Sequence, residues 1–294
     1  MADVREMTDR YMNDPSRKIY TFKEMGVPGL SVLGRLHLHS AGNPSDYHYH
    51  QDRIEIKLFI SGNTVIFTEE KEYHLKGGDI FITPANMPHG TGSLPTGVCE
   101  AYWTQLLTGT PSFLFLETEW AAELQRQLKS LPIGVIRGVN YSRKYLADMF
   151  SFITSDISFD KYRGVSRLVS ILHEIIAARS QLQDSPSADI QKAIDFIRTN
   201  INDEIVLEDL AEEAGLSLIS LIRKFQEQIG MPPRMFINVK KIETAKELLA
   251  KGKSVTDTAF ALGFNSSSYF TSVFRKFTRM TPGEFAKKKQ QQIN

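Results

Sequence analysis

The chain has 294 residues, of which 41% are hydrophobic and 23% charged, and its formal net charge is +1. These proportions are ordinary for a globular protein, and the length favours two domains over one. The single cysteine, Cys99, excludes an internal disulfide framework and cysteine-rich zinc modules. A reducing compartment is therefore expected.

The charge is unevenly distributed along the chain. Residues 214–294 hold 14 Lys and Arg against five Asp and Glu, a net charge of +9, whereas the residues before them carry −8. This asymmetry indicates that the C-terminal part meets a polyanion. The first 18 residues are charged and lack an apolar core, so no secretory signal is expected. No apolar run is long enough to span a membrane, and the expected location is the cytoplasm.

Residues 30–105 are predicted to form short strands. Four segments, 30–40, 53–62, 64–75 and 79–90, alternate polar with apolar residues or run apolar. Turn residues separate them at 61–63 and 77–79. Short strands at this spacing are typical of a β-sandwich or a small barrel.

The hydrophobic period changes to a helical one near residue 140. The spacing predicts helices over 142–155 and 160–181, and the second carries an apolar stripe of Leu168, Leu172 and Ile175. That stripe fits either a dimer contact or packing on the strands. A polar stretch at 183–188 marks a domain boundary, so the expected parts are residues 1–139, 140–182 and 188–294.

The C-terminal part contains an internal repeat. Ala211 and Gly215 recur 48 residues later, and Phe225 and Phe236 recur 49 residues later as Phe274 and Phe285. Each copy has a short helix, a turn with glycine, a second helix ending near a phenylalanine, and a proline that opens the next helix. This order is that of a helix-turn-helix motif. Two copies can place two reading helices in successive major grooves.

The repeat resembles the DNA-binding domain of the AraC/XylS family of transcription regulators. The residues that carry the resemblance are LEDLAEEAGLSLISLIRKFQEQIGMPPRMFI and VTDTAFALGFNSSSYFTSVFRKFTRMTPGEF. The similarity covers about the last 105 residues and implies a regulator, commonly an activator, that binds double-stranded DNA. It also implies RNA polymerase and a second copy of the chain as partners.

The resemblance places reading helices at about 218–228 and 267–277. Arg223 is the candidate for a bidentate contact to guanine, beside the apolar Ile219 and Ile222. In the second copy Ser267, Ser268, Thr271 and Ser272 face outward. Lysine and arginine further along are candidates for phosphate contacts. These residues are Lys224, Arg275, Lys276 and Arg279.

The front segment resembles the cupin superfamily. Glycine, histidine and glutamate at Gly42, His48, His50, Glu55 and Gly62 fit its first motif, and GDIFITPANMPH fits its second. Asn86 and Ser93 depart from the usual Gly and Asn. The fold implied is α+β in several domains: a cupin-like β-barrel, then helices, then an all-α domain with two helix-turn-helix motifs.

Cupins that bind metal would place their ligands here at His48, His50, Glu55 and His89. Such a set suits zinc, nickel, manganese or non-haem iron. The same side chains could instead hydrogen-bond a small ligand, or satisfy one another inside the barrel. Arg35, Tyr102 and Trp103 are further candidates for an effector contact, and aromatic side chains with a charged donor would suit a sugar.

These features together predict a DNA-binding regulator, not an enzyme, controlled by a small molecule in the front barrel. A sugar is the expected effector, and no catalytic residue or firmly expected cofactor is assigned. The alternative is a metal-dependent cupin enzyme fused to a DNA-binding domain. Cys99 alone cannot supply the cysteines of a repair protein with alkyl-transfer activity.

Overall fold

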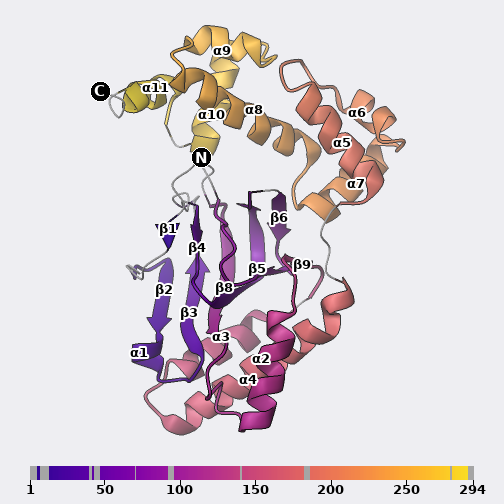
Figure 1. The fold of residues 1–294 in the computed structure, drawn as a ribbon. Helices are drawn as coiled ribbons and strands as arrows, with labels where there is room; N and C mark the ends of the chain where they lie inside the picture. The colour runs from indigo at the N-terminus through magenta and orange to yellow at the C-terminus, as the bar shows by residue number, and fades with distance from the viewer. Residues whose placement is uncertain are drawn as a thin grey trace. The chain divides into compact units, whose positions relative to one another are not determined.

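The computed structural model describes residues 5–6, 13–39, 42, 47–69, 71–91, 96–139, 141–181, 186–278 and 280–290. The chain divides into two compact units. The front unit comprises residues 1–92 and 96–184, and the rear unit holds residues 185–294. The expected α+β class is confirmed, with strands in the front unit and helices in the rear unit (Figure 1). None of the described helices is long and apolar enough to cross a membrane.

Antiparallel strands build the front unit. The main sheet has the order β2-β3-β8-β5-β7-β9, with β6 paired to β5, and β1 pairs separately with β4. The strands are β1 (Arg5–Glu6), β2 (Arg17–Thr21), β3 (Leu30–His37), β4 (His48–Tyr49), β5 (Arg53–Phe67), β6 (Glu72–Lys76), β7 (Ile80–Thr83), β8 (Cys99–Leu107) and β9 (Gly134–Ile136).

One predicted turn is absent, because residues 61–63 lie inside the single strand β5. Gly62 has a φ of +80°, and a bulge falls between Phe59 and Ser61. A Cβ atom at Gly62 would lie 1.9 Å from the carbonyl oxygen of Val98. The glycine therefore lets β5 bend while pairing continues on both sides.

The two faces of the sheet differ in chemistry because successive side chains of a strand alternate. One face, called here the polar face, carries Glu55, Lys57 and Gln105 beside a smaller set of apolar side chains that includes Phe59, Phe81 and Trp103. The other carries Tyr102 and the apolar side chains that form the main core with the helices of the front unit. Its strand members are Leu33, Ile54, Ile56, Leu58, Ile80, Ile82 and Leu106.

Four helices and one 3-10 turn complete the front unit. They are α1 (Phe22–Met25), α2 (Thr118–Lys129), α3 (Arg143–Ile153), α4 (Ser158–Ala177) and the turn Ala178–Gln181. The two helices predicted after residue 140 are present as α3 and α4. The stripe of Leu168, Leu172 and Ile175 is at most 1% exposed and belongs to the main core. Of the two roles that the stripe could fill, the structure gives it packing within the front unit.

Seven helices form the described rear unit. They are α5 (Ala188–Thr199), α6 (Leu207–Glu213), α7 (Leu218–Ile229), α8 (Pro233–Ala250), α9 (Val255–Ala261), α10 (Ser267–Thr278) and α11 (Pro282–Gln290). The repeat therefore consists of α6 and α7 in the first copy and α9 and α10 in the second, with α8 between them. Both predicted helix-turn-helix motifs are confirmed.

The repeated phenylalanines make the same packing contact in both copies. The rings of Phe225 and Phe236 lie 5.3 Å apart, and those of Phe274 and Phe285 lie 5.6 Å apart. Phe225 and Phe274 are fully buried. These aromatic pairs therefore fix α7 to α8 in the first copy and α10 to α11 in the second.

Helix α4 crosses α3 at Gly164. A Cβ atom there would lie 2.7 Å from the backbone nitrogen of Ile153 and 3.0 Å from the carbonyl oxygen of Met149. Gly283 in α11 has no such neighbour within 4 Å. We expect Gly164→Ala to destabilise the protein by roughly 1–3 kcal/mol, since the backbone atoms cannot move aside.

The matched change Gly283→Ala should be neutral or stabilise by up to about 1 kcal/mol, the usual preference of a helix for alanine. Calorimetric unfolding of the full chain measures both variants. Equal melting temperatures for the two would contradict a tight crossing at Gly164.

Candidate functional site

Helix α7 presents the first candidate reading surface. Its start is fixed by Ser217, whose hydroxyl accepts a hydrogen bond from the amide of Ser220. Ile219 is 81% exposed and Ile222 40% exposed. The guanidinium of Arg223 is exposed and lies 3.3 Å from Glu227 one turn later. An exposed ion pair of this kind is weak, so the guanidinium of Arg223 is available to another partner.

Lys224 has a partner in the rear unit itself. Its ammonium donates to Asp189, two residues into the segment that follows the domain boundary. The hydrogen bonds from Lys224 and Ser187 lower the pKa of Asp189 to about 2. The amide of Ser187 donates to the side chain of Gln228, at 2.8 Å. The start of α5 is thus tied to the reading helix by two separate contacts.

Helix α10 presents the second candidate surface. Ser268, Ser272, Arg275 and Lys276 are exposed. Ser267 and Thr271 are half-buried, and the hydroxyl of Thr271 donates to the carbonyl of Ser267 at 2.8 Å. That hydroxyl is therefore already occupied. Arg279, also expected to meet phosphate, lies outside the described residues.

Tyr269 is an additional exposed side chain on α10 that was not among the predicted DNA contacts. Its side chain is 53% exposed, between the two exposed serines. The sequence offered one signal for it, since a large aromatic at a position that the helical period places outside is unusual.

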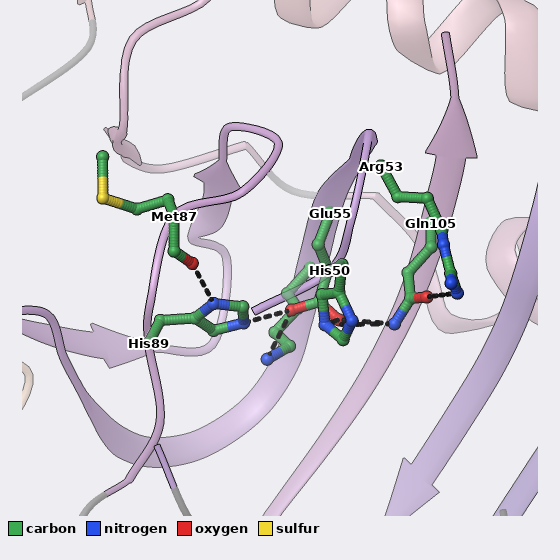
Figure 2. Close-up of polar contacts among 7 residues, drawn as sticks. His50, Arg53, Glu55, Met87, His89 and Gln105 are labelled. Atoms are coloured by element: carbon green, nitrogen blue, oxygen red, sulfur yellow. Dashed lines mark hydrogen bonds and ion pairs between the residues drawn. The ribbon is translucent and has the colours of Figure 1, made fainter. Parts of the chain in front are cut away.

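In the front unit, a polar cluster surrounds the buried carboxylate of Glu55. Glu55 accepts hydrogen bonds from His89 at 3.1 Å and from the amide of Gln105 at 3.2 Å, and lies 3.2 Å from His50. The ammonium of Lys57 lies 2.7 Å away. Figure 2 shows the carboxylate between His89 on one side and Gln105 on the other. The cupin-like motif of the sequence includes both histidines and Glu55, whereas Lys57 and Gln105 lie outside the motif positions.

Backbone pairing brings the histidines together. His48 and His89 form an antiparallel bridge with hydrogen bonds of 3.0 and 2.9 Å, and their ring centroids are 4.6 Å apart. The nearby turn contains Asn86 with a φ of +63°. Asparagine tolerates this left-handed backbone, which explains how it can replace the usual glycine of the motif. The other departure, Ser93, lies outside the described residues.

The pKa of Glu55 reflects two opposed effects. Burial raises it, but the Lys57 ammonium and the hydrogen bonds from His50 and His89 outweigh burial and hold the pKa well below its usual range. The carboxylate therefore stays charged in the interior. A buried charge is tolerated only when it is paired and hydrogen-bonded, which is the case here.

Both nitrogens of His89 face acceptors. Nδ1 lies 3.0 Å from the carbonyl oxygen of Met87, and Nε2 lies 3.1 Å from Glu55. A neutral imidazole has one N–H, so it can satisfy only one of these contacts. In His50, the buried Nδ1 has no hydrogen-bond partner.

Three of the four expected metal ligands form a compact group. One ring nitrogen from each of His48, His50 and His89 lies within 4.8 Å of the others. Three imidazoles at this separation fit a divalent transition metal. Glu55 is already engaged by the Lys57 ammonium, which would oppose a dication beside it. The residues thus fit a three-histidine site that Glu55 orients through hydrogen bonds.

The remaining effector candidates lie on both faces of the sheet. Trp103 is on the polar face, where it packs with Ile19 and Val32. Tyr102 and Arg35 lie on the opposite face, where the guanidinium carbon of Arg35 is 5.9 Å from the centre of the Tyr102 ring. The structure therefore brings Trp103 to the same face as Glu55 and separates Tyr102 and Arg35 from it.

Comparison with known proteins agrees with this geometry. A model described as an AraC-like ligand binding domain matches residues 34–185, and one described as a helix-turn-helix domain matches residues 210–288. The first alone covers more than half of the chain. The chain belongs to the AraC family of transcriptional regulators. It is thus a DNA-binding regulator with a ligand-binding domain.

Individual relatives of this AraC-family chain are also regulators. An HTH-type transcriptional regulator from Haemophilus influenzae is 26% identical over 78% of this chain and 85% of its own length. Another, from the cgkA 5′ region of Pseudoalteromonas carrageenovora, is 38% identical over 33% of this chain. The match spans 57% of that relative's length.

A solved AraC-type regulator structure from Chromobacterium violaceum is 27% identical to this AraC-family chain. The match covers 35% of this chain and 93% of the other, with a TM-score of 0.33.

Replacement of Glu55 tests the polar cluster. Glu55→Gln leaves the Lys57 ammonium without its anion, and we expect the free energy of unfolding to fall by roughly 1–3 kcal/mol. Because the pKa of Glu55 is lowered on folding, the wild-type advantage is present above the usual carboxyl pKa of 4.5 and is lost as the pH falls through the folded value. Urea unfolding at several pH values measures both effects.

The control is Glu119→Gln on α2, where the glutamate is exposed. It should leave the free energy of unfolding unchanged. A Glu55→Gln variant as stable as this control would contradict a charged Glu55 at the centre of the cluster.

Proposed function

We propose that the chain is a transcription activator that reads DNA with α7 and α10 and responds to a small molecule bound in the front unit. The observation that carries the proposal is the pair of helix-turn-helix motifs, each with an exposed reading helix, in the segment that holds the positive charge. Phosphate attraction supplies affinity, and base contacts supply specificity.

The proposed reading contacts differ between the two helices. Arg223 on α7 reads guanine, while Ile219 and Ile222 contact thymine methyl groups. On α10 the small hydroxyl side chains of Ser267, Ser268 and Ser272 can hydrogen-bond to more than one kind of base, and Thr271 lies on the same face of the helix. The phosphate contacts of α10 come from Arg275 and Lys276. Lys224 meets phosphate once it leaves Asp189. The first half-site is therefore read more strictly than the second.

For the effector we propose a sugar, held by polar groups of the polar face. His50, Glu55 and Gln105 offer both donors and acceptors, and hydroxyl groups can match either. The Glu55 charge is offset by Lys57, which favours an uncharged polar ligand. Specific recognition of DNA by such small modules calls for two copies of the chain, and activation calls for RNA polymerase.

A metal-dependent cupin enzyme is the competing function, and the three-histidine group is what favours it. A divalent ion there would supply Lewis-acid chemistry. In such an enzyme His48, His50 and His89 would hold the ion, and Glu55 would fix the orientation of His50 and His89.

Arg223 gives a test of DNA reading. A duplex that the wild-type protein enriches from a random library should contain one guanine that the protein prefers over other bases. The variant Arg223→Ala should bind equally well when another base replaces that guanine. The expected loss is about 1–3 kcal/mol of discrimination at one base pair. Gel-shift titration of single-base variants measures it.

Glu208→Ala, at an exposed acidic position in α6, serves as the control and should keep the preference. If Arg223→Ala retained the full guanine preference, α7 would not read DNA in this way. If no duplex were enriched at all, the proposed DNA reading would fail.

The histidine cluster is tested by measuring metal content and melting temperature, with and without a panel of sugars. We expect one sugar to raise the melting temperature of the wild-type protein. At a sugar concentration of 100 times the dissociation constant, the expected gain in the free energy of unfolding is about 2.7 kcal/mol. The double variant His48→Ala/His50→Ala should lose this shift.

Stoichiometric metal that is lost in the double variant, with turnover of a sugar or aromatic compound, would instead establish the enzyme. A wild-type protein with neither signal would contradict an effector role for the cluster.

A further inference from the structure

A groove of the rear unit runs between the start of α8 and the middle of α10. Helix α10 contributes Tyr269, Ser272, Val273, Lys276 and Phe277. The start of α8 contributes Pro232, Arg234, Met235 and Asn238. Two of these residues, Ser272 and Lys276, already belong to the proposed reading helix, so the groove opens beside the surface that would face DNA.

The charge of this groove has one sign. Arg234 and Lys276 are exposed cations, and none of the described residues that line the groove is acidic. No ion pair of Arg234 is found among the described residues, in contrast to Arg223 and Lys224, which have acidic partners. Cations without an acidic neighbour, at a surface next to a DNA-reading helix, match a phosphate backbone. A protein partner with both signs of charge fits less well, since its own cations would find no acidic group in the groove.

The floor of the groove is apolar. Met235, Val273 and Phe277 line it together with the two cations. Such a floor suits the carbon edge of a deoxyribose, while the cations and the Asn238 amide suit the phosphates on either side. A helix that enters the major groove, about 12 Å wide, is flanked by both backbone strands. One strand must therefore pass the side of α10 on which α8 begins.

We propose that this groove holds one strand of the sugar–phosphate backbone of bound duplex DNA, with Arg234 as a phosphate contact supplied by α8. The proposal rests on the proposed reading role of α10 and adds a helix that is not itself a reading helix. It gives α8 two tasks, since the helix both joins the two motifs and holds the DNA between them. Phosphate contacts of this kind set the register of both reading helices.

The test uses the full chain and a duplex that the wild-type protein has enriched from a random library. The affinity is measured by fluorescence anisotropy between 50 and 200 mM salt. Each lost phosphate contact lowers the slope of log affinity against log salt by about 0.9. Arg234→Ala should show this loss. The ratio of wild-type to variant affinity should therefore fall about 3.5-fold as the salt concentration rises from 50 to 200 mM.

Two further variants complete the design. Arg234→Lys keeps the cation and should keep most of the slope. Lys251→Ala removes an exposed cation just past the other end of α8 and should leave the slope unchanged. Thermal melting of each variant establishes that the rear unit is folded, as expected for exposed positions.

Several outcomes overturn the inference. An unchanged slope in Arg234→Ala would remove the groove from the DNA interface, and normal DNA binding with lost transcription in a purified system would assign it to a protein partner. An equal fall in Lys251→Ala would reduce the effect to overall charge. Failure of the wild-type protein to enrich any duplex would instead end the proposed DNA reading, so the two failures are distinguishable.

Discussion

The pairing of one buried negative charge organises the interior of the front unit. Glu55 lies on the central strand β5, and its carboxylate is surrounded by Lys57, Gln105 and two histidines. Lys57 lies on β5 itself, whereas Gln105 comes from β8 and the two histidines come from loops, so the full set of partners forms only when the strands are in register. A shift of β5 by one residue would place Glu55 among the apolar side chains that contact α3 and α4. The requirement to pair this charge therefore selects one register of the sheet.

Local chemistry made the rear unit predictable from sequence. Gly215 and Gly263 have φ values of +67° and +61°, which glycine adopts freely. In the helices that follow these turns, the hydroxyls of Ser217 and Ser266 accept hydrogen bonds from the amides of Ser220 and Tyr269. These signals act within a few residues. The repeat contains these signals twice. Both predicted reading helices begin at the expected residues, Leu218 and Ser267.

Other features of the fold depend on contacts between distant segments and could not be predicted. The need for glycine at position 62 of β5 comes from the distant Val98, and the role of Gln105 depends on the pairing of β8 with β5. The separation of Tyr102 from Trp103 is different. Consecutive residues of a strand point to opposite faces, so alternation alone could have assigned these two side chains to different sites.

The tie between α5 and α7 has a thermodynamic consequence. Asp189 and Ser187 stand at the point where the chain leaves the domain boundary, and they hold Lys224 and Gln228 of the first reading helix. A phosphate that takes Lys224 must displace Asp189. By reciprocity, a ligand of the front unit that drew this segment away would change the affinity for DNA, and DNA would change the affinity for that ligand by the same factor. The hydrogen bonds of Ser187 and Asp189 would thus let the segment between the two units couple ligand binding to DNA binding, in addition to joining the units.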